Sequence, residues 1–210
     1  STQQLFLCNH IIRKYQVMGF EKITEFESAL AEFTGAPYAV MTDCCTHAIE
    51  LCLRVDRVKR CSIPAHTYLS VPMTLHKLDI AFDYTDIDWL GEYQLTGTRV
   101  WDSARLLKQD MYRPGMLQCL SFGYDKPLSI GRGGAVLTDD VEVYNVLKLQ
   151  CYDGRDLTIS HWGNQKTFRI GYHYRPTIEE AVQALELLPT VDQEPKPKQY
   201  PDLREIIIIK

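Results

Sequence analysis

Apolar positions along the chain follow two periods that alternate from one segment to the next. Between residues 20 and 33 they recur at helical spacing with glutamates between them, and Gly35 and Pro37 end this predicted helix. Short apolar runs bounded by turn residues predict buried strands. The pattern predicts helices over residues 20–33, 46–53, 68–78, 141–149 and 177–188, and strands over residues 37–41, 61–63, 80–83, 98–101, 117–122 and 135–138.

The alternation of strand and helix predicts an α/β fold, with a mostly parallel (mixed) sheet and helices on both faces. Residues 1–188 would form one domain. After Pro189 the composition changes to proline and charged residues, which predicts a linker over residues 189–210. The linker ends in the run Ile206 to Ile209, which is interpreted as an edge strand or as an apolar tail that needs a partner surface.

The composition excludes several classes of protein. The chain has 210 residues, of which 45% are hydrophobic and 24% charged, as in a globular protein rather than a disordered one. A net charge of -4 leaves no basic excess for nucleic acid. Seven cysteines without a C-x-x-C pair indicate a reduced, cytoplasmic compartment. The first residues lack the pattern of a signal peptide, and no apolar run is as long as a membrane span, so no membrane partner is expected.

Three segments carry candidate chemistry, each with a plain structural alternative. Thr46 follows Cys44 and Cys45 at the start of a predicted helix, where free backbone N–H groups bind anions, although Thr46 could equally cap the helix. Asp102 follows a predicted strand and could point into a ligand crevice or be an ordinary turn residue. Lys126 lies in a glycine-flanked loop between strands and is either an amine nucleophile or a surface lysine.

Taken in series, these motifs resemble the DegT/DnrJ/EryC1/StrS family of sugar aminotransferases, which have fold type I and depend on pyridoxal 5'-phosphate (PLP). The resemblance extends from about residue 15 to residue 188, with six segments in the family's order. The matching segments are residues 26–40, residues 44–51, residues 64–68, Asp102-Ser-Ala-Arg105, Ser121-Phe-x-x-x-Lys126 with Gly131-x-Gly-Gly134 after it, and residues 171–175.

The resemblance implies two catalytic residues. Lys126 matches the lysine that attaches to the cofactor aldehyde and later moves a proton between the substrate carbon and the cofactor. Asp102 matches the carboxylate that pairs with the pyridinium nitrogen and keeps it protonated. No metal site is expected, because His66 and His76 are ten residues apart without a third ligand near them in sequence.

The resemblance also implies a set of cofactor-binding residues. Tyr68 would stack on the cofactor ring, while Cys45, Thr46 and Ser121 would hold the phosphate. Arg105 stands where the family has a histidine or glutamine near the ring hydroxyl. His173 stands where the family has an asparagine that reaches the phosphate from the partner subunit, which implies a homodimer. Cys45 replaces the glycine of the family's Ser-Gly-Thr turn, and Cys44 and Cys45 are otherwise interpreted as inert buried thiols.

The expected reaction is transfer of an amino group from an amino acid, glutamate, to a keto sugar linked to a nucleotide. Relative to the family, the chain is expected to be a shortened cofactor domain that lacks the C-terminal small domain. Two alternatives stay open: other PLP chemistry on the same scaffold, and a catalytically reduced homologue that acts as a binding or interaction protein. Arg155, Arg169 and Arg175 are further candidates for binding a carboxylate or diphosphate, or are structural.

Overall fold

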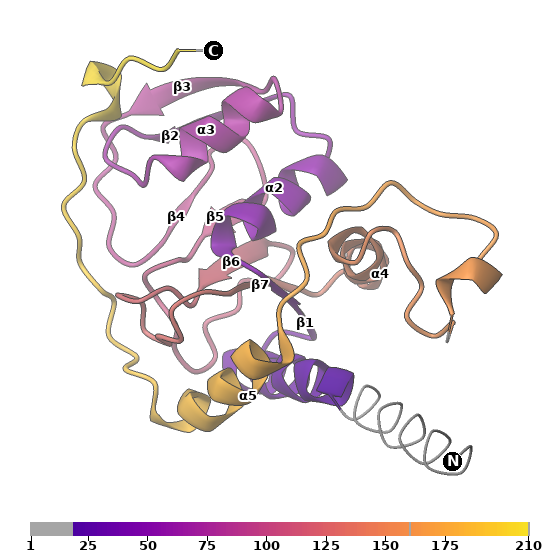
Figure 1. The fold of residues 1–210 in the computed structure, drawn as a ribbon. Helices are drawn as coiled ribbons and strands as arrows, with labels where there is room; N and C mark the ends of the chain where they lie inside the picture. The colour runs from indigo at the N-terminus through magenta and orange to yellow at the C-terminus, as the bar shows by residue number, and fades with distance from the viewer. Residues whose placement is uncertain (1–18, 160, 210) are drawn as a thin grey trace, which may run out of the picture.

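The computed structural model describes residues 19–159 and 161–209. Cys8 and the N-terminal residues on which the expected lack of a signal peptide depends lie outside the described residues. A five-stranded sheet forms the centre of the molecule (Figure 1). Its strand order is β1-β7-β6-β5-β4, with β1 at Tyr38–Thr42, β7 at Gly134–Thr138, β6 at Leu117–Ser121, β5 at Val100–Asp102 and β4 at Tyr93–Gln94.

The sheet is mixed, but most of its strand pairs are antiparallel, whereas the prediction was a mostly parallel sheet. Only β5 and β6 pair in parallel within it, whereas β1–β7, β6–β7 and β4–β5 are antiparallel. The link between β4 and β5, residues 95–99, is too short for a crossover, so these two strands are antiparallel.

Helices cover both faces of the sheet, which confirms the α/β fold. Side chains of each strand alternate between the two faces, so that Val136 of β7 faces one core while its neighbours Ala135 and Leu137 face the other. The first core is closed by α2 (Cys45–Val55), α3 (Ser70–Lys77) and α4 (Val141–Cys151), and the second by the helix of residues 19–34 and α5 (Ile178–Leu187). Because both faces are buried, β1, β6 and β7 consist mostly of apolar residues.

The predicted helices and strands are present within two residues of their expected bounds, and β4 is the one described strand that was not predicted. The strand β4 has only two residues, too few for a periodic signal. A second sheet pairs β2 (Arg60–Pro64) with β3 (Ala81–Thr85) in parallel, and the main chain of Ser62 joins it to Thr96 through two hydrogen bonds of 2.9 and 2.8 Å.

The C-terminal residues lie against the body of the molecule. After α5, the chain runs along one side of the sheet, drawn in yellow in Figure 1, and reaches β3. Leu203 is buried there. Residues 206–209 form no strand, and the side chains of Ile207 and Ile209 are exposed, so the edge strand expected there is not formed. Among the described helices, none has both the length and the apolar character needed to span a membrane.

Candidate active site

A cavity of about 400 Å³ lies where β5 and β6 end and α2 begins. Because β5 and β6 are parallel, their carboxyl ends meet at the same edge of the sheet, which is where open α/β folds bind ligands. Seven of the eight site residues expected from the sequence line this cavity: Cys45, Thr46, Tyr68, Asp102, Arg105, Ser121 and Lys126.

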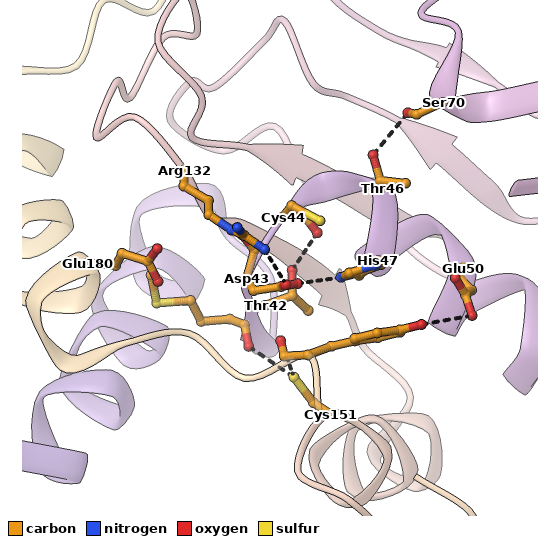
Figure 2. Close-up of polar contacts among 12 residues, drawn as sticks. Thr42, Asp43, Cys44, Thr46, His47, Glu50, Ser70, Arg132, Cys151 and Glu180 are labelled. Carbon is orange, nitrogen blue, oxygen red and sulfur yellow. Dashed lines mark hydrogen bonds and ion pairs between the residues drawn. The ribbon is translucent and has the colours of Figure 1, made fainter. Parts of the chain in front are cut away.

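The start of α2 forms one wall of the cavity. Cys44 is extended and precedes the helix, and no acidic residue occupies the first turn. The Thr46 Oγ1 donates to the Ser70 Oγ at 2.9 Å, so hydroxyl groups lie beside the helix N-terminus (Figure 2). A Cβ atom on Gly134 would lie 2.5 Å from the main chain of Cys45, and glycine is therefore needed for β7 to lie so close. Such a helix N-terminus with hydroxyl donors can hold an anion.

Asp102 ends β5 and is buried at the floor of the cavity. Its carboxylate accepts hydrogen bonds of 3.0 Å from the Tyr93 hydroxyl and from the main-chain N–H of Ala104. Burial raises the pKa of Asp102, although these two donors and the charge of Lys126 oppose the shift. A cation placed beside this carboxylate would restore its charged form.

Lys126 lies on the turn after β6, and its main-chain N–H donates to Gly123 at 3.2 Å. Its side chain is 14% exposed, and Nζ lies 3.8 Å from Asp125 Oδ1. Burial, followed by the charge of Arg105, lowers the pKa of Lys126, while Asp125, Cys45 and Asp102 oppose that shift. A larger fraction of this amine is therefore uncharged at neutral pH than of a solvated lysine.

Arg105 is buried beside Lys126 and binds the C-terminal segment. Its Nε donates to the Lys196 carbonyl at 2.5 Å, and its Nη1 lies 3.2 Å from Asp125 Oδ2. Lys198 Nζ donates to the same carboxylate at 2.7 Å. The hydrogen bond of Lys198, together with the charges of Lys126 and Arg105, lowers the pKa of Asp125 to about 2.

Several cavity residues were missed by the sequence interpretation. Trp89, Asp125, Lys198 and Tyr200 line the cavity together with Thr67 and Ser70. Asp125 adjoins the lysine motif and could have been included on that ground. Lys198 and Tyr200 stand in the proline-rich segment, where no periodicity or motif signals a contact with a site far away in sequence.

A polar cluster supports the start of α2, and one of its members, Arg132, also lines the cavity (Figure 2). Asp43 Oδ1 lies 2.7 Å from His47 Nδ1, and Asp43 Oδ2 accepts from Arg132 Nη2 at 2.8 Å. The His47 ring stacks on Tyr174 at 3.6 Å between ring centroids. Burial acts to lower the pKa of His47, but hydrogen bonds to Asp43 and Cys44 and their charges together outweigh it and raise the pKa to about 9.

His173 lies away from the cavity, unlike the other seven residues. Its side chain is exposed, and its Nδ1 lies 2.9 Å from Asp153 Oδ2. Its expected role in the partner subunit's site stays a prediction. The Cys45 thiol is buried, and burial followed by the charge of Asp102 raises its pKa well above the ordinary value, which disfavours the reactive thiolate.

Comparison with known proteins agrees with the resemblance that the motifs carry. Residues 3–94 match the model of the DegT/DnrJ/EryC1/StrS aminotransferase family, which confirms the recognition over this part of the chain. The fold is similar to that of 3-amino-5-hydroxybenzoic acid synthase, with a TM-score of 0.68 and 21% identity over 81% of this chain. It is also similar to a DegT DnrJ EryC1 StrS aminotransferase from Brucella abortus, with a TM-score of 0.68 and 18% identity over 80% of this chain.

A third similar structure is PseC of Helicobacter pylori, an aminotransferase involved in the biosynthesis of pseudoaminic acid, with a TM-score of 0.67 and 17% identity over 80% of this chain. The chain covers 56%, 58% and 57% of the lengths of the synthase, the Brucella protein and PseC. A search of curated proteins gave no match. At these identities, the likeness to solved structures establishes the fold.

Proposed function

We propose, from its confirmed resemblance to the DegT/DnrJ/EryC1/StrS aminotransferases over residues 3–94, that this chain binds PLP and uses it to transfer an amino group. The donor in this proposal is an amino acid, glutamate, and the acceptor is a keto sugar linked to a nucleotide. The observation that carries the proposal is the joint position of Lys126, Asp102 and the start of α2 around one cavity.

The residues of the cavity fit the parts of this cofactor. The N-terminus of α2, with the hydroxyls of Thr46 and Ser121, would hold the phosphate, as Gly134 leaves room for the close approach of β7. Asp102 would lie against the pyridine nitrogen, and Tyr68 would cover the ring. When bound, PLP supplies an electron sink for a carbanion formed at the substrate carbon.

Lys126 provides the amine that the proposal needs. Because its pKa is lowered, a larger fraction of Nζ is uncharged and nucleophilic at neutral pH than in a solvated lysine. Lys126 lines the cavity on a turn rather than in a helix. The same nitrogen can therefore accept a proton from a carbon of a bound substrate and return it to a neighbouring carbon. Asp125 lies 3.8 Å from Nζ, and the positive charge of Arg105 disfavours the protonated form of the amine.

Asp102 provides the charge on the other side of the cavity. The Tyr93 hydroxyl, which also lies 2.6 Å from the Thr67 Oγ1, fixes the orientation of the carboxylate. A pyridinium nitrogen beside Asp102 would offset the burial that raises the pKa of the carboxyl group. The carboxylate would thereby keep the ring protonated, and the protonated ring is the better electron acceptor.

Trapping of the cofactor tests this proposal. The purified full chain is mixed with PLP and reduced with borohydride, and the modified peptide is mapped by mass spectrometry. We expect PLP on Lys126, absorption in the visible range before reduction, and loss of both in Lys126→Ala. Lys108→Ala, which removes an exposed lysine outside the cavity, is expected to behave as the wild type. Modification spread evenly over surface lysines would contradict the proposal.

The nature of the reaction is tested with an amino donor. We expect incubation of the PLP-loaded protein with glutamate to yield 2-oxoglutarate in stoichiometric amount. One structure with a similar fold, at a TM-score of 0.66 and 16% identity, is a GDP-4-keto-6-deoxymannose-3-dehydratase, so that dehydration of a keto sugar is the second candidate. A protein that binds PLP but forms no 2-oxoglutarate would favour that candidate or a binding role.

The proposal includes a homodimer in which His173 reaches the partner's cofactor phosphate. The exposed side chain of His173 is compatible with this role. Light scattering of the PLP-loaded protein measures the oligomeric state, and a monomer with tightly bound PLP would remove His173 from the site. A cytoplasmic location stays a prediction, consistent with the free thiols of the six described cysteines.

A further inference from the structure

Residues 195–203, here called the C-terminal strap, contribute Lys198 and Tyr200 to the wall of the cavity and are fixed at both ends. At one end, the main chain of Lys196 exchanges hydrogen bonds with Arg105: its N–H donates to the Arg105 carbonyl at 2.8 Å, and its carbonyl accepts from Arg105 Nε at 2.5 Å. At the other end, the Leu203 N–H donates to Ala65 at 3.0 Å. The strap is therefore bound through its main chain to two segments of the cavity wall.

Aromatic contacts hold the middle of the strap. The Tyr200 ring stacks on Trp89, with 6.0 Å between ring centroids and 20° between the planes. The Tyr200 carbonyl lies 3.0 Å from His66 Nδ1, and Trp89 Nε1 donates to the His66 carbonyl at 2.9 Å. These contacts place Lys198, two residues before Tyr200, in the lining of the cavity.

A second close approach fits the strap to the body of the protein. Gly91 has a φ of +79°, and a Cβ atom there would lie 2.9 Å from Pro195 Cβ. Any other residue at position 91 would both strain the main chain and displace the start of the strap. The close contact therefore depends on the glycine at position 91 as well as on Pro195 of the strap.

The charged end of Lys198 reaches the neighbours of Lys126. Asp125 receives Lys198 Nζ at 2.7 Å and Arg105 Nη1 at 3.2 Å on one oxygen, while its other oxygen lies 3.8 Å from Lys126 Nζ. Lys198 and Arg105 therefore lie within hydrogen-bond distance of Asp125, whereas the Lys126 amine does not. Lys198 thus competes with Lys126 for Asp125.

We propose that the C-terminal strap is a working wall of the active site, and that Lys198 is a positioning residue that acts on Lys126 through Asp125. The proposal rests on the proposed function in taking Lys126 as the reactive amine. By drawing Asp125 toward the strap, Lys198 leaves the Lys126 amine less firmly paired and thereby more readily uncharged. The groups that face Lys126 are Arg105, Asp125, Cys45 and Asp102; of these, Arg105 contacts the main chain of the strap at Lys196, and Asp125 contacts the side chain of Lys198.

The test measures the Lys126 amine directly, in the full chain freed of bound aldehyde and without added PLP. Acetic anhydride acetylates uncharged amines, and mass spectrometry gives the rate at Lys126 as a function of pH. In Lys198→Ala we expect the midpoint of this profile to rise by about half a pH unit, the size expected of one half-exposed charge. Lys198→Arg keeps the charge and is expected to restore the wild-type midpoint.

Two further variants test whether the effect is specific to Lys198 and passes through Asp125. Lys22 is matched to Lys198, because each is about half exposed and paired with a carboxylate, and Lys22→Ala is expected to leave the Lys126 midpoint unchanged. Asp125→Asn should lower the midpoint, and Lys198→Ala should add no further shift to it. An unchanged midpoint in Lys198→Ala, or an equal shift in the Asp125→Asn background, would overturn the proposal. Circular dichroism confirms that each variant is folded.

This result is separate from the test of the proposed function. A shifted acetylation profile in a protein that does not trap PLP would support the role of the strap and contradict the cofactor proposal. Trapping of PLP on Lys126 with the same profile in wild type and Lys198→Ala would support the cofactor and overturn the role of the strap.

Discussion

At the start of α2, the carboxylate of Asp43 pairs with two basic side chains, and burial affects the protonation of this cluster. Asp43 is held by His47 on one oxygen and by Arg132 on the other, and the imidazole is enclosed against Tyr174. Burial opposes the charged form, but the hydrogen bonds and charges of Asp43 and Cys44 together outweigh it and raise the pKa of His47 to about 9 from an ordinary value of 6.5. His47 is therefore charged in the folded protein at neutral pH.

The raised pKa predicts that stability falls with alkaline pH. A group whose pKa is higher in the folded state contributes stability that is complete below its unfolded pKa, near 6.5, and is lost as the pH rises through about 9. We expect a loss of about 1–2 kcal/mol in the free energy of unfolding between pH 6 and pH 9.5, after allowance for solvent around the pair. Urea unfolding at the two pH values measures it.

The variant His47→Gln isolates this contribution. It should be less stable than the wild type at pH 6, and the two proteins should differ little at pH 9.5. His161→Gln, at an exposed histidine outside the cluster, serves as the control and should retain the full dependence on pH. A pH dependence in His47→Gln as large as that of the wild type would contradict the assignment.

At the scale of elements, the site depends on how closely α2 and β7 approach each other. The isolated bridge between Cys44 and Gly133 and the missing side chain at Gly134 bring the first turn of the helix against the strand. The family's turn has a glycine where this chain has Cys45, and here the close approach is provided from the opposite side by Gly134. The replacement of that glycine is therefore compatible with a tight anion cradle.

Gly134→Ala is predicted to open this contact. Its Cβ would lie 2.5 Å from the main chain of Cys44 and of Cys45, so that α2 must shift, at a cost of about 1–3 kcal/mol in the free energy of unfolding. We also expect the affinity for PLP to fall several-fold, because the helix N-terminus moves. Denaturant unfolding and a PLP titration measure the two effects.

Gly123→Ala is the matched control for this prediction. The nearest atom to a Cβ there is Lys126 Cγ at 3.7 Å, an ordinary contact, so its stability should stay near that of the wild type. Equal stability of Gly134→Ala and Gly123→Ala would show that the cradle tolerates a side chain.

At the scale of the whole molecule, one buried ion pair links the helices of the two faces. Glu27, in the helix of residues 19–34, accepts hydrogen bonds of 2.9 and 2.7 Å from Lys148 of α4. The same carboxylate accepts from the Met41 N–H of the edge strand β1 at 2.8 Å. Burial raises the pKa of Glu27, although Lys148 and Met41 oppose the shift. The ion pair stabilises this edge of the sheet only while both partners are present, because loss of one leaves the other as a buried, unpaired charge.

Removal of one partner is predicted to be more harmful than removal of both. Lys148→Met leaves a buried carboxylate without its cation and should reduce the free energy of unfolding by about 3 kcal/mol. In Glu27→Gln/Lys148→Met the amide can still accept from Met41, and we expect at least half of the loss to be recovered. Equilibrium unfolding of the wild type and the two variants gives the comparison, and a double variant less stable than Lys148→Met would contradict it.

The sequence alone determined the helices, the longer strands and seven of the residues that line the cavity. These features are local, because hydrophobic period, turn residues and short motifs at the ends of elements are written in neighbouring positions. Asp102, Thr46 and Lys126 come together since each lies at the end of an element, and the ends of parallel strands and the starts of the helices share one edge of the sheet.

The tertiary structure alone decided the contacts between distant segments. Nothing near Lys198 or Tyr200 in the sequence indicates that they line the cavity, because an irregular segment has no period and its place depends on main-chain bonds to Arg105 and Ala65. The antiparallel pairing of β1 with β7 likewise joins segments that lie far apart in the sequence. Burial, which sets the pKa values of Asp102 and Lys126, exists only once these segments are packed together.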